Sequence, residues 1–128
     1  MRPARCPRGF TLIELLVVLA IIGTLLTIAL PKYLHSVARS REAVLHQDLR
    51  VMRTAIDQFY ADSGHYPASL DELVDRRYLR SLPDDPETDS ATTWVAVKPP
   101  DEVAATGVYD VRSGARGNSI DGTPFDQW

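Results

Sequence analysis

A single carboxylate lies near the start of a long apolar run, where its charge needs a partner. Glu14 is the only charged residue between residues 10 and 30. At the centre of a membrane-spanning helix an ionised acid costs about 2.5–3.5 kcal/mol on insertion scales, and less near the helix end. A nearby ammonium would neutralise it, because opposite charges attract strongly in a low dielectric. We therefore expect Glu14 to pair with a cation; an ordinary signal anchor with a stray acid is the alternative.

The residues around Glu14 also indicate a processing site. Residues 9–14 read GFTLIE, and this motif resembles the processing site of type IV pilins and of the pseudopilins of type II secretion systems. The resemblance implies that a prepilin peptidase cuts between Gly9 and Phe10, and that Phe10 is then N-methylated. It also implies that Glu14 meets the N-terminal amine of a neighbouring subunit during assembly.

The apolar run follows the expected cut, so it stays in the mature protein, whereas a secretory signal peptide would place it before the cleavage site. Its 21 residues suffice to span roughly 30 Å of hydrocarbon as a helix. We expect residues 1–9 to form a prepilin leader, residues 10–31 a transmembrane and assembly helix, and residues 32–128 a globular domain. Basic residues flank both sides of the run almost equally, so only the resemblance places the leader in the cytoplasm and the domain in the periplasm.

The composition argues for a small acidic domain. Without residues 1–9 the chain has 11 basic and 17 acidic residues, a formal net charge of −6. This balance argues against a nucleic-acid partner. The one cysteine, Cys6, lies in the expected leader, so the mature chain has no internal disulfide. Many type IV pilins close their C-terminal region with a cysteine pair, and its absence favours the pseudopilins within the resemblance.

A single long helix is expected from about Phe10 to about Asp62. Its second half carries an apolar stripe at helical spacing, which must cover the globular domain. The stripe consists of Leu45, Leu49, Met52, Ile56 and Phe59. The opposite side is interpreted as a solvated face of mixed charge, formed by Arg39, Arg41, Asp48, Arg50, Arg53 and Asp57. Between Gly23 and Pro31 we expect a kink or local melting.

The remainder predicts a short helix and two strands. Ser63 and Gly64 mark the end of the long helix. Ser69 and Glu72 have the spacing of a capping box, which predicts a helix from about Leu70 to Arg76. Residues 92–97 and 107–112 have strand composition and predict an antiparallel pair. The expected fold is α+β and type IV pilin-like: a long helix packed against a small antiparallel sheet, with a short helix and a C-terminal loop.

The chain shows no catalytic constellation. His35, His46 and His65 are far apart and lack metal-ligand spacing. No phosphate-binding loop, nucleophile elbow or cysteine nucleophile follows the leader. We therefore expect that the protein is not an enzyme.

The C-terminal loop, residues 113–128, is the one place where a ligand is expected. Its carboxylates and carbonyls suit calcium, and the resemblance to major pseudopilins implies a calcium ion held here, with Asp121 and Asp126 as the candidate ligands. One departure is Arg116, where the family often has an acid; its guanidinium would replace the ion by pairing with either aspartate. The third interpretation is a turn-rich tail whose Phe125 and Trp128 pack back onto the domain.

The resemblance implies a pseudopilin subunit, most similar to the major type, that polymerises into the periplasmic filament of a type II secretion system and helps to export folded proteins. Its expected partners are copies of itself in a helical homopolymer, other pseudopilins, the prepilin peptidase and, indirectly, the inner-membrane platform and a cytoplasmic ATPase. The expected location is the bacterial inner membrane, crossed once. A type IV pilus subunit is the main alternative; a monomeric membrane-anchored binding module and a tethered hydrolase are others.

Overall fold

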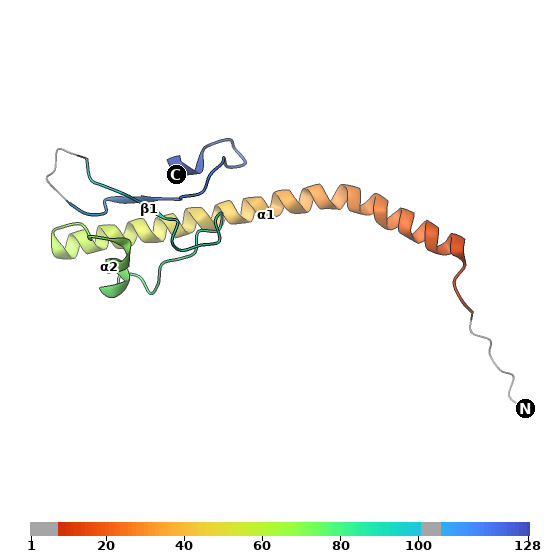
Figure 1. The fold of residues 1–128 in the computed structure, drawn as a ribbon, viewed down its shortest axis with the longest axis horizontal. Helices are drawn as coiled ribbons and strands as arrows, with labels where there is room; N and C mark the ends of the chain where they lie inside the picture. Colours follow the sequence, from red (N-terminus) through yellow and green to blue (C-terminus); the bar gives the residue numbers. More distant parts are fainter. Residues whose placement is uncertain (1–7, 101–105) are drawn as a thin grey trace, which may run out of the picture. The chain divides into compact units, whose positions relative to one another are not determined.

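A computed structural model of the protein describes residues 8–100 and 106–128, so most of the expected leader, including Cys6, lies outside it. The chain divides into two compact units, which meet between Val37 and Ala38. The elements, shown in Figure 1, are α1 (Leu12–Ser63), α2 (Leu70–Asp75), β1 (Val95–Val97), β2 (Asp110–Arg112) and the 3-10 helix η1 (Phe125–Gln127). The α+β, type IV pilin-like fold expected from the sequence is confirmed.

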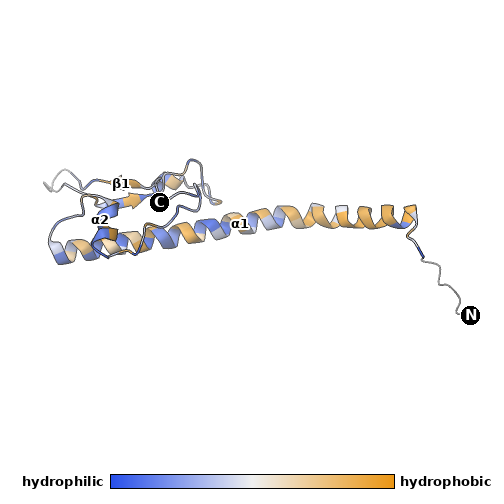
Figure 2. Cartoon of the chain, turned by 60° about the horizontal axis from the view of Figure 1, so that its bottom comes forward, coloured by the Kyte–Doolittle hydropathy of each residue, from blue (hydrophilic) through white to orange (hydrophobic). Residues whose placement is uncertain are grey.

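The first unit contains the N-terminal part of α1, which is hydrophobic and exposed along its length (Figure 2). Its mean hydropathy of 2.6 and its length make it the one helix among the described residues that is able to cross a membrane. Two threonines inside it satisfy their hydroxyls locally: Thr24 Oγ1 donates to the Ala20 carbonyl at 2.8 Å and Thr27 Oγ1 to the Gly23 carbonyl at 2.9 Å. A hydroxyl bonded to its own helix presents no unpaired donor to hydrocarbon.

We expected a kink or local melting between Gly23 and Pro31. The melting is wrong, because α1 is helical without interruption from Leu12 to Ser63, whereas the kink stays a prediction. Proline removes one backbone donor at position 31 and leaves the hydrogen bonds of the neighbouring turns in place. Long helical segments on both sides hold the geometry, so the lost bond does not unwind the helix here.

The second unit is built on the C-terminal half of α1, and the predicted apolar stripe is its core. The five stripe residues, from Leu45 to Phe59, are each 2 % exposed or less. They form one buried cluster with Leu73 of α2, with Trp94 just before β1, and with Val111 of β2. Fully burying such side chains contributes roughly 1.5–3 kcal/mol each, so the stripe is the main apolar support of the unit.

The helix ends follow the sequence signals only in part. Gly64 ends α1 at a φ of +75°, and its N–H donates to the Tyr60 carbonyl at 2.8 Å, as the glycine signal predicts. At the start of α2 the capping box is incomplete, because Ser69 makes no side-chain cap. Glu72 instead accepts from the backbone N–H of Ala68 at 2.7 Å, one residue earlier than the motif requires.

The two strands form an antiparallel pair beside α1, with Ala96 opposite Val111. Both are shorter than predicted. Before β1, the Thr93 hydroxyl donates to the Ser90 carbonyl at 3.2 Å. Before β2, the Val108 N–H donates to the Pro67 carbonyl at 2.8 Å, which ties the strand to the turn after α1, while the Tyr109 N–H still donates to the Val97 carbonyl of β1 at 2.8 Å. The regular pairing extends over three residues of each strand.

The loop between α2 and β1 is organised by one buried acid, Asp85, which is fully buried. Its carboxylate accepts from the backbone N–H of Glu87 at 2.9 Å and from the hydroxyl of Ser113. Farther along, the indole of Trp94 donates to the Pro83 carbonyl at 2.8 Å. A buried carboxylate with two donors is satisfied, and it joins this loop to the segment after β2.

Asp85 also acts on its neighbours through its charge. Desolvation by partial burial, and then repulsion from Asp85, raises the pKa of Asp48 on α1 above its ordinary value of 3.8. Desolvation, partly offset by the Arg41 cation, likewise raises the pKa of Glu87. A raised carboxyl pKa means that the ionised group destabilises the folded state, fully above the folded pKa and not at all below the ordinary one.

We therefore predict that Asp48→Asn raises the melting temperature at pH 7. The gain should shrink as the pH falls through the raised pKa of Asp48, and it should vanish below about pH 3.8, where the carboxyl is protonated in both states. Thermal unfolding of the full chain in detergent from pH 3 to 8 measures this. Asp57→Asn, on the same helix, is the matched control. A gain that does not change with pH would contradict the electrostatic explanation.

Candidate functional site: the N-terminal end of α1

The expected cleavage point lies in non-helical chain just before α1. Gly9 and Phe10 are exposed, and Phe10 is 91 % exposed, so the bond between them is reachable by another protein. A side chain at Gly9 would meet no atom within 4 Å in the described chain. The fold therefore gives no packing reason for glycine at this position, and a requirement for it has to come from outside the chain.

Glu14 lies in the first turn of α1 and bonds to Thr11, the residue just before the helix. Its Oε2 accepts from both the backbone N–H and the hydroxyl of Thr11, each at 3.4 Å. In return, the Glu14 N–H donates to Thr11 Oγ1 at 3.3 Å. This reciprocal arrangement is a capping box, in which the N-cap residue and the third helical residue satisfy each other's free backbone donors.

The sequence analysis missed this cap, although the spacing of Thr11 and Glu14 is its known signature. Within the described part of the chain, Glu14 forms no ion pair with the cationic partner that was expected for it. The carboxylate instead sits at the positive end of the helix dipole, where negative charge is favourable. The bonds are long, and a carboxylate accepts about four hydrogen bonds, so Glu14 retains capacity for a stronger donor.

The C-terminal loop does not bring the predicted ligands into one cluster. Asp121 is exposed in the turn closed by the Gly122 N–H and the Ser119 carbonyl, 2.9 Å apart. Asp126 lies in η1, and its backbone carbonyl accepts from Arg112 at 3.3 Å. In residues 8–100 and 106–128 no three acidic, histidine or cysteine side chains gather as a metal site would require. Calcium binding therefore stays a prediction.

The two other interpretations of this loop have different outcomes. Within the described chain, Arg116 forms no ion pair with Asp121 or Asp126. The packed tail is confirmed: Phe125 is buried in the core cluster and Trp128 packs against it. Burial of these two aromatic side chains therefore holds the segment to the domain, and neither aspartate carboxylate takes part in it.

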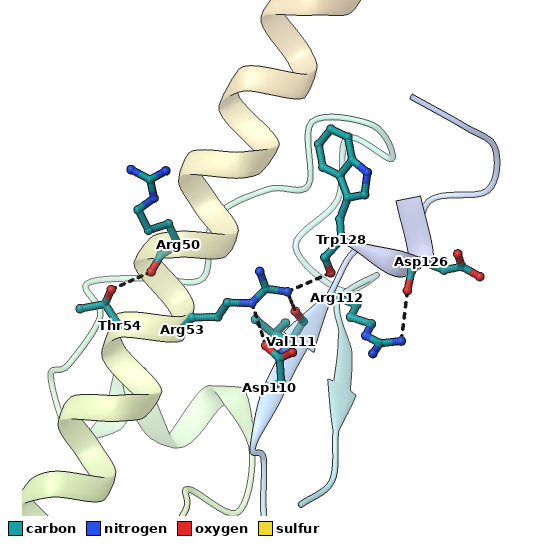
Figure 3. Close-up of polar contacts among 8 residues, drawn as sticks. All are labelled: Arg50, Arg53, Thr54, Asp110, Val111, Arg112, Asp126 and Trp128. Atoms are coloured by element: carbon teal, nitrogen blue, oxygen red, sulfur yellow. Dashed lines mark hydrogen bonds and ion pairs between the residues drawn. The ribbon is translucent and has the colours of Figure 1, made fainter. Parts of the chain in front are cut away.

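The expected solvated face of α1 is wrong for two of its residues, Arg53 and Asp48, which are partly buried. Arg53 donates to Asp110 in β2, and Figure 3 shows its guanidinium turned toward the strands. Asp48 is partly desolvated. Arg41 stays exposed, as predicted, and also donates to the Pro86 carbonyl at 2.6 Å. The other members of the face, Arg39, Arg50 and Asp57, are exposed.

Comparison with known proteins agrees with the N-terminal motif. Residues 5–30 match the family described as the prokaryotic N-terminal methylation motif. The chain is 39 % identical over 80 residues to fimbrial protein EcpC of Eikenella corrodens, covering 59 % of this chain and 52 % of that protein. It is also 39 % identical over 66 residues to the type IV major pilin protein PilA of Myxococcus xanthus, covering 52 % of this chain and 30 % of that one.

A further relative matches over a greater length. The type II secretion system core protein G of Escherichia coli is 29 % identical over 129 residues, covering 88 % of this chain and 84 % of that protein. The chain thus spans about half of EcpC, less than a third of PilA and most of core protein G. No solved structure matches the chain significantly. The resemblance to type IV pilin-like proteins is confirmed.

We predict that Thr11→Val loosens the first turn of α1. Loss of an N-cap hydroxyl costs about 0.5–2 kcal/mol, so amide hydrogen exchange at residues 13–15 should become roughly 2- to 30-fold faster in the full chain in detergent. Thr11→Ser should retain the protection. Thr24→Val, which removes a hydroxyl in the middle of the helix, is the control. Unchanged exchange in Thr11→Val would show that the cap does not form in solution.

Proposed function

We propose that this chain is a pseudopilin subunit that polymerises into the periplasmic filament of a type II protein secretion system and helps drive the export of folded proteins. The observation that carries the proposal is the match to core protein G over 88 % of this chain and 84 % of that relative. A match of that extent includes the globular domain, where pilins and pseudopilins differ, and not only the N-terminal motif.

In this proposal the protein acts by assembly and is not an enzyme. The apolar part of α1 holds the precursor in the inner membrane, with the domain in the periplasm. A prepilin peptidase cuts after Gly9, and Phe10 becomes the N-methylated first residue. Apolar helices of several copies then bundle, as exposed apolar surface of this size requires. A cytoplasmic ATPase, acting through the inner-membrane platform, supplies the energy.

Glu14 gives the assembly step its specificity. Before assembly its carboxylate bonds weakly to Thr11, at 3.4 Å. The Phe10 ammonium of a neighbouring copy is a charged donor, and charge-assisted hydrogen bonds are roughly twice as strong as neutral ones. Away from water the exchange of Thr11 for an ammonium is favourable, so an incoming subunit is accepted where its N-terminus reaches Glu14.

A type IV pilus subunit, serving adhesion, motility or DNA uptake, is the second candidate. Its support is the higher identity, 39 %, to fimbrial protein EcpC and to the major pilin PilA. Those matches cover little more than half of this chain, whereas the match to core protein G extends over most of it. The absence of cysteine after Cys6 also favours the secretion filament, because the chain lacks the cysteine pair that closes many pilins.

Deletion of the gene decides between the two filaments. For a pseudopilin we expect the deletion strain to lose exported proteins from the medium and to accumulate them in the periplasm, with surface pili intact. A plasmid copy of the same gene should restore export. An unchanged medium together with lost pili or lost twitching would transfer the assignment to the type IV pilus.

We predict that Glu14→Ala is inserted and cleaved but assembles poorly. If the ion pair contributes about 1.4 kcal/mol per contact, association falls about tenfold for each one lost. Chemical crosslinking of membranes measures the ladder of multimers, and mass spectrometry of the monomer verifies the cut after Gly9. Thr24→Ala is a control in the same helix. A normal ladder from cleaved Glu14→Ala would refute the pairing.

A further inference from the structure

The segment 113–128 packs on the domain without a disulfide and without a recognisable metal site among the described residues. It contains no cysteine, and the described residues gather no acidic cluster of metal-site size. Yet Ala115, Ser119 and Phe125 are all buried. A segment with only one 3-10 turn has little regular backbone bonding of its own, so side chains of other elements have to hold it.

Arg53 of α1 is the first of these side chains. Its Nε donates to Asp110 Oδ1 at 2.7 Å, and one terminal nitrogen donates to the backbone oxygens of Val111 at 3.0 Å and Trp128 at 2.9 Å (Figure 3). The same oxygen of Asp110 accepts from the Val111 N–H at 2.8 Å, which fixes the carboxylate. One planar guanidinium thus joins α1, β2 and Trp128. Lysine, whose ammonium lacks the planar fork of donors, would not reproduce this geometry.

Two more residues of α1 hold the same segment. Glu42 accepts from the backbone N–H of Ile120 at 2.6 Å, so a carboxylate caps the tip of the loop. The His46 imidazole stacks on the indole of Trp128, with ring centroids 3.8 Å apart and planes 14° apart. Glu42, His46 and Arg53 lie within about three helical turns, roughly 16 Å along the axis. Together we call these three residues the α1 clasp.

Several backbone oxygens that a calcium ion could use inside this segment already accept hydrogen bonds. The ion takes six to eight oxygen ligands. The backbone oxygens of residues 117, 119, 123 and 126 all accept hydrogen bonds from the chain. Glu42, a carboxylate bonded to the loop, is occupied by Ile120. Asp121 is exposed at the tip of its turn. These oxygens therefore fit a segment that is held by hydrogen bonds better than a segment that is folded around a calcium ion.

We propose that the α1 clasp holds the C-terminal segment on the domain and that the segment stays ordered without a calcium ion. Arg53 supplies what an ion would supply, a positive charge that gathers a carboxylate and two backbone oxygens. The difference is that this cation belongs to the chain. The order of the segment then does not depend on the calcium concentration outside the cell membrane.

The first arm of the test uses the unaltered full chain in detergent micelles. Trypsin cleavage after the exposed Arg116 releases the end of the segment, and its rate under mild digestion follows the opening of the folded state. We expect the same rate in a calcium chelator and in millimolar calcium, and the same melting temperature. Faster cleavage in chelator, or a clear rise in melting temperature with calcium, would overturn the proposal.

The second arm tests the clasp itself. Arg53→Ala should speed cleavage after Arg116 by at least about tenfold, with or without calcium, and should lower the melting temperature by about 4–8 °C or more. Arg50→Ala is the matched control, since Figure 3 shows the Arg50 side chain directed away from β2 and it is exposed. Equal rates for Arg53→Ala and Arg50→Ala would overturn the role of Arg53.

A variant with a smaller effect keeps the test decisive if Arg53→Ala does not fold. Glu42→Ala removes only the contact with Ile120, so we expect faster cleavage after Arg116 and unchanged cleavage after Arg76, which lies at the end of α2. Equal acceleration at both sites would indicate general destabilisation and would count against a clasp. Restoration of slow cleavage by calcium in either variant would show that an ion site exists in the segment.

Discussion

The structure depends on one constraint: a single helix has to be apolar on all sides along its first half and apolar on one side along its second half. The first half, within the unit that ends at Val37, has no partner in the described chain. The second half buries its stripe from Leu45 to Phe59 in the core. Apolar surface is stable only away from water, so the first half needs lipid or other helices while the second needs its own domain.

A small domain resting on one helix has little core, and polar contacts carry much of its architecture. Asp85 joins the loop before β1 to the segment after β2, and Arg53 joins α1 to β2 and Trp128. Both side chains have several partners, which is the condition under which a partly or fully buried charge stabilises a fold. These residues take the place of the disulfide that the sequence lacks, since each connects parts of the chain far apart in sequence.

Local sequence patterns predicted the features of this fold that local physics determines. The apolar stripe, the glycine end of α1 and the antiparallel pairing were predicted correctly because each follows from periodicity or from one residue's conformational freedom. Arg53 was assigned to solvent because its partners are 57 to 75 residues away, which no local pattern shows. The Thr11–Glu14 cap was not predicted, although the spacing of these two residues is the signature of a capping box and is visible in the sequence alone.

In the proposed filament, the cap would let one carboxylate serve both a free subunit and an assembled one. A fully satisfied, tightly bonded Glu14 would resist any new partner, since a ligand shifts an equilibrium only by its difference in affinity for the two states. An unbonded carboxylate would raise the cost of membrane insertion. Bonds of 3.3–3.4 Å to Thr11 lie between these limits. They give the Glu14 carboxylate hydrogen-bond donors in the free chain, and little free energy is lost when an ammonium replaces them. In the proposed filament, the weakness of these bonds in the free chain permits Glu14 to exchange Thr11 for the ammonium of a neighbouring copy.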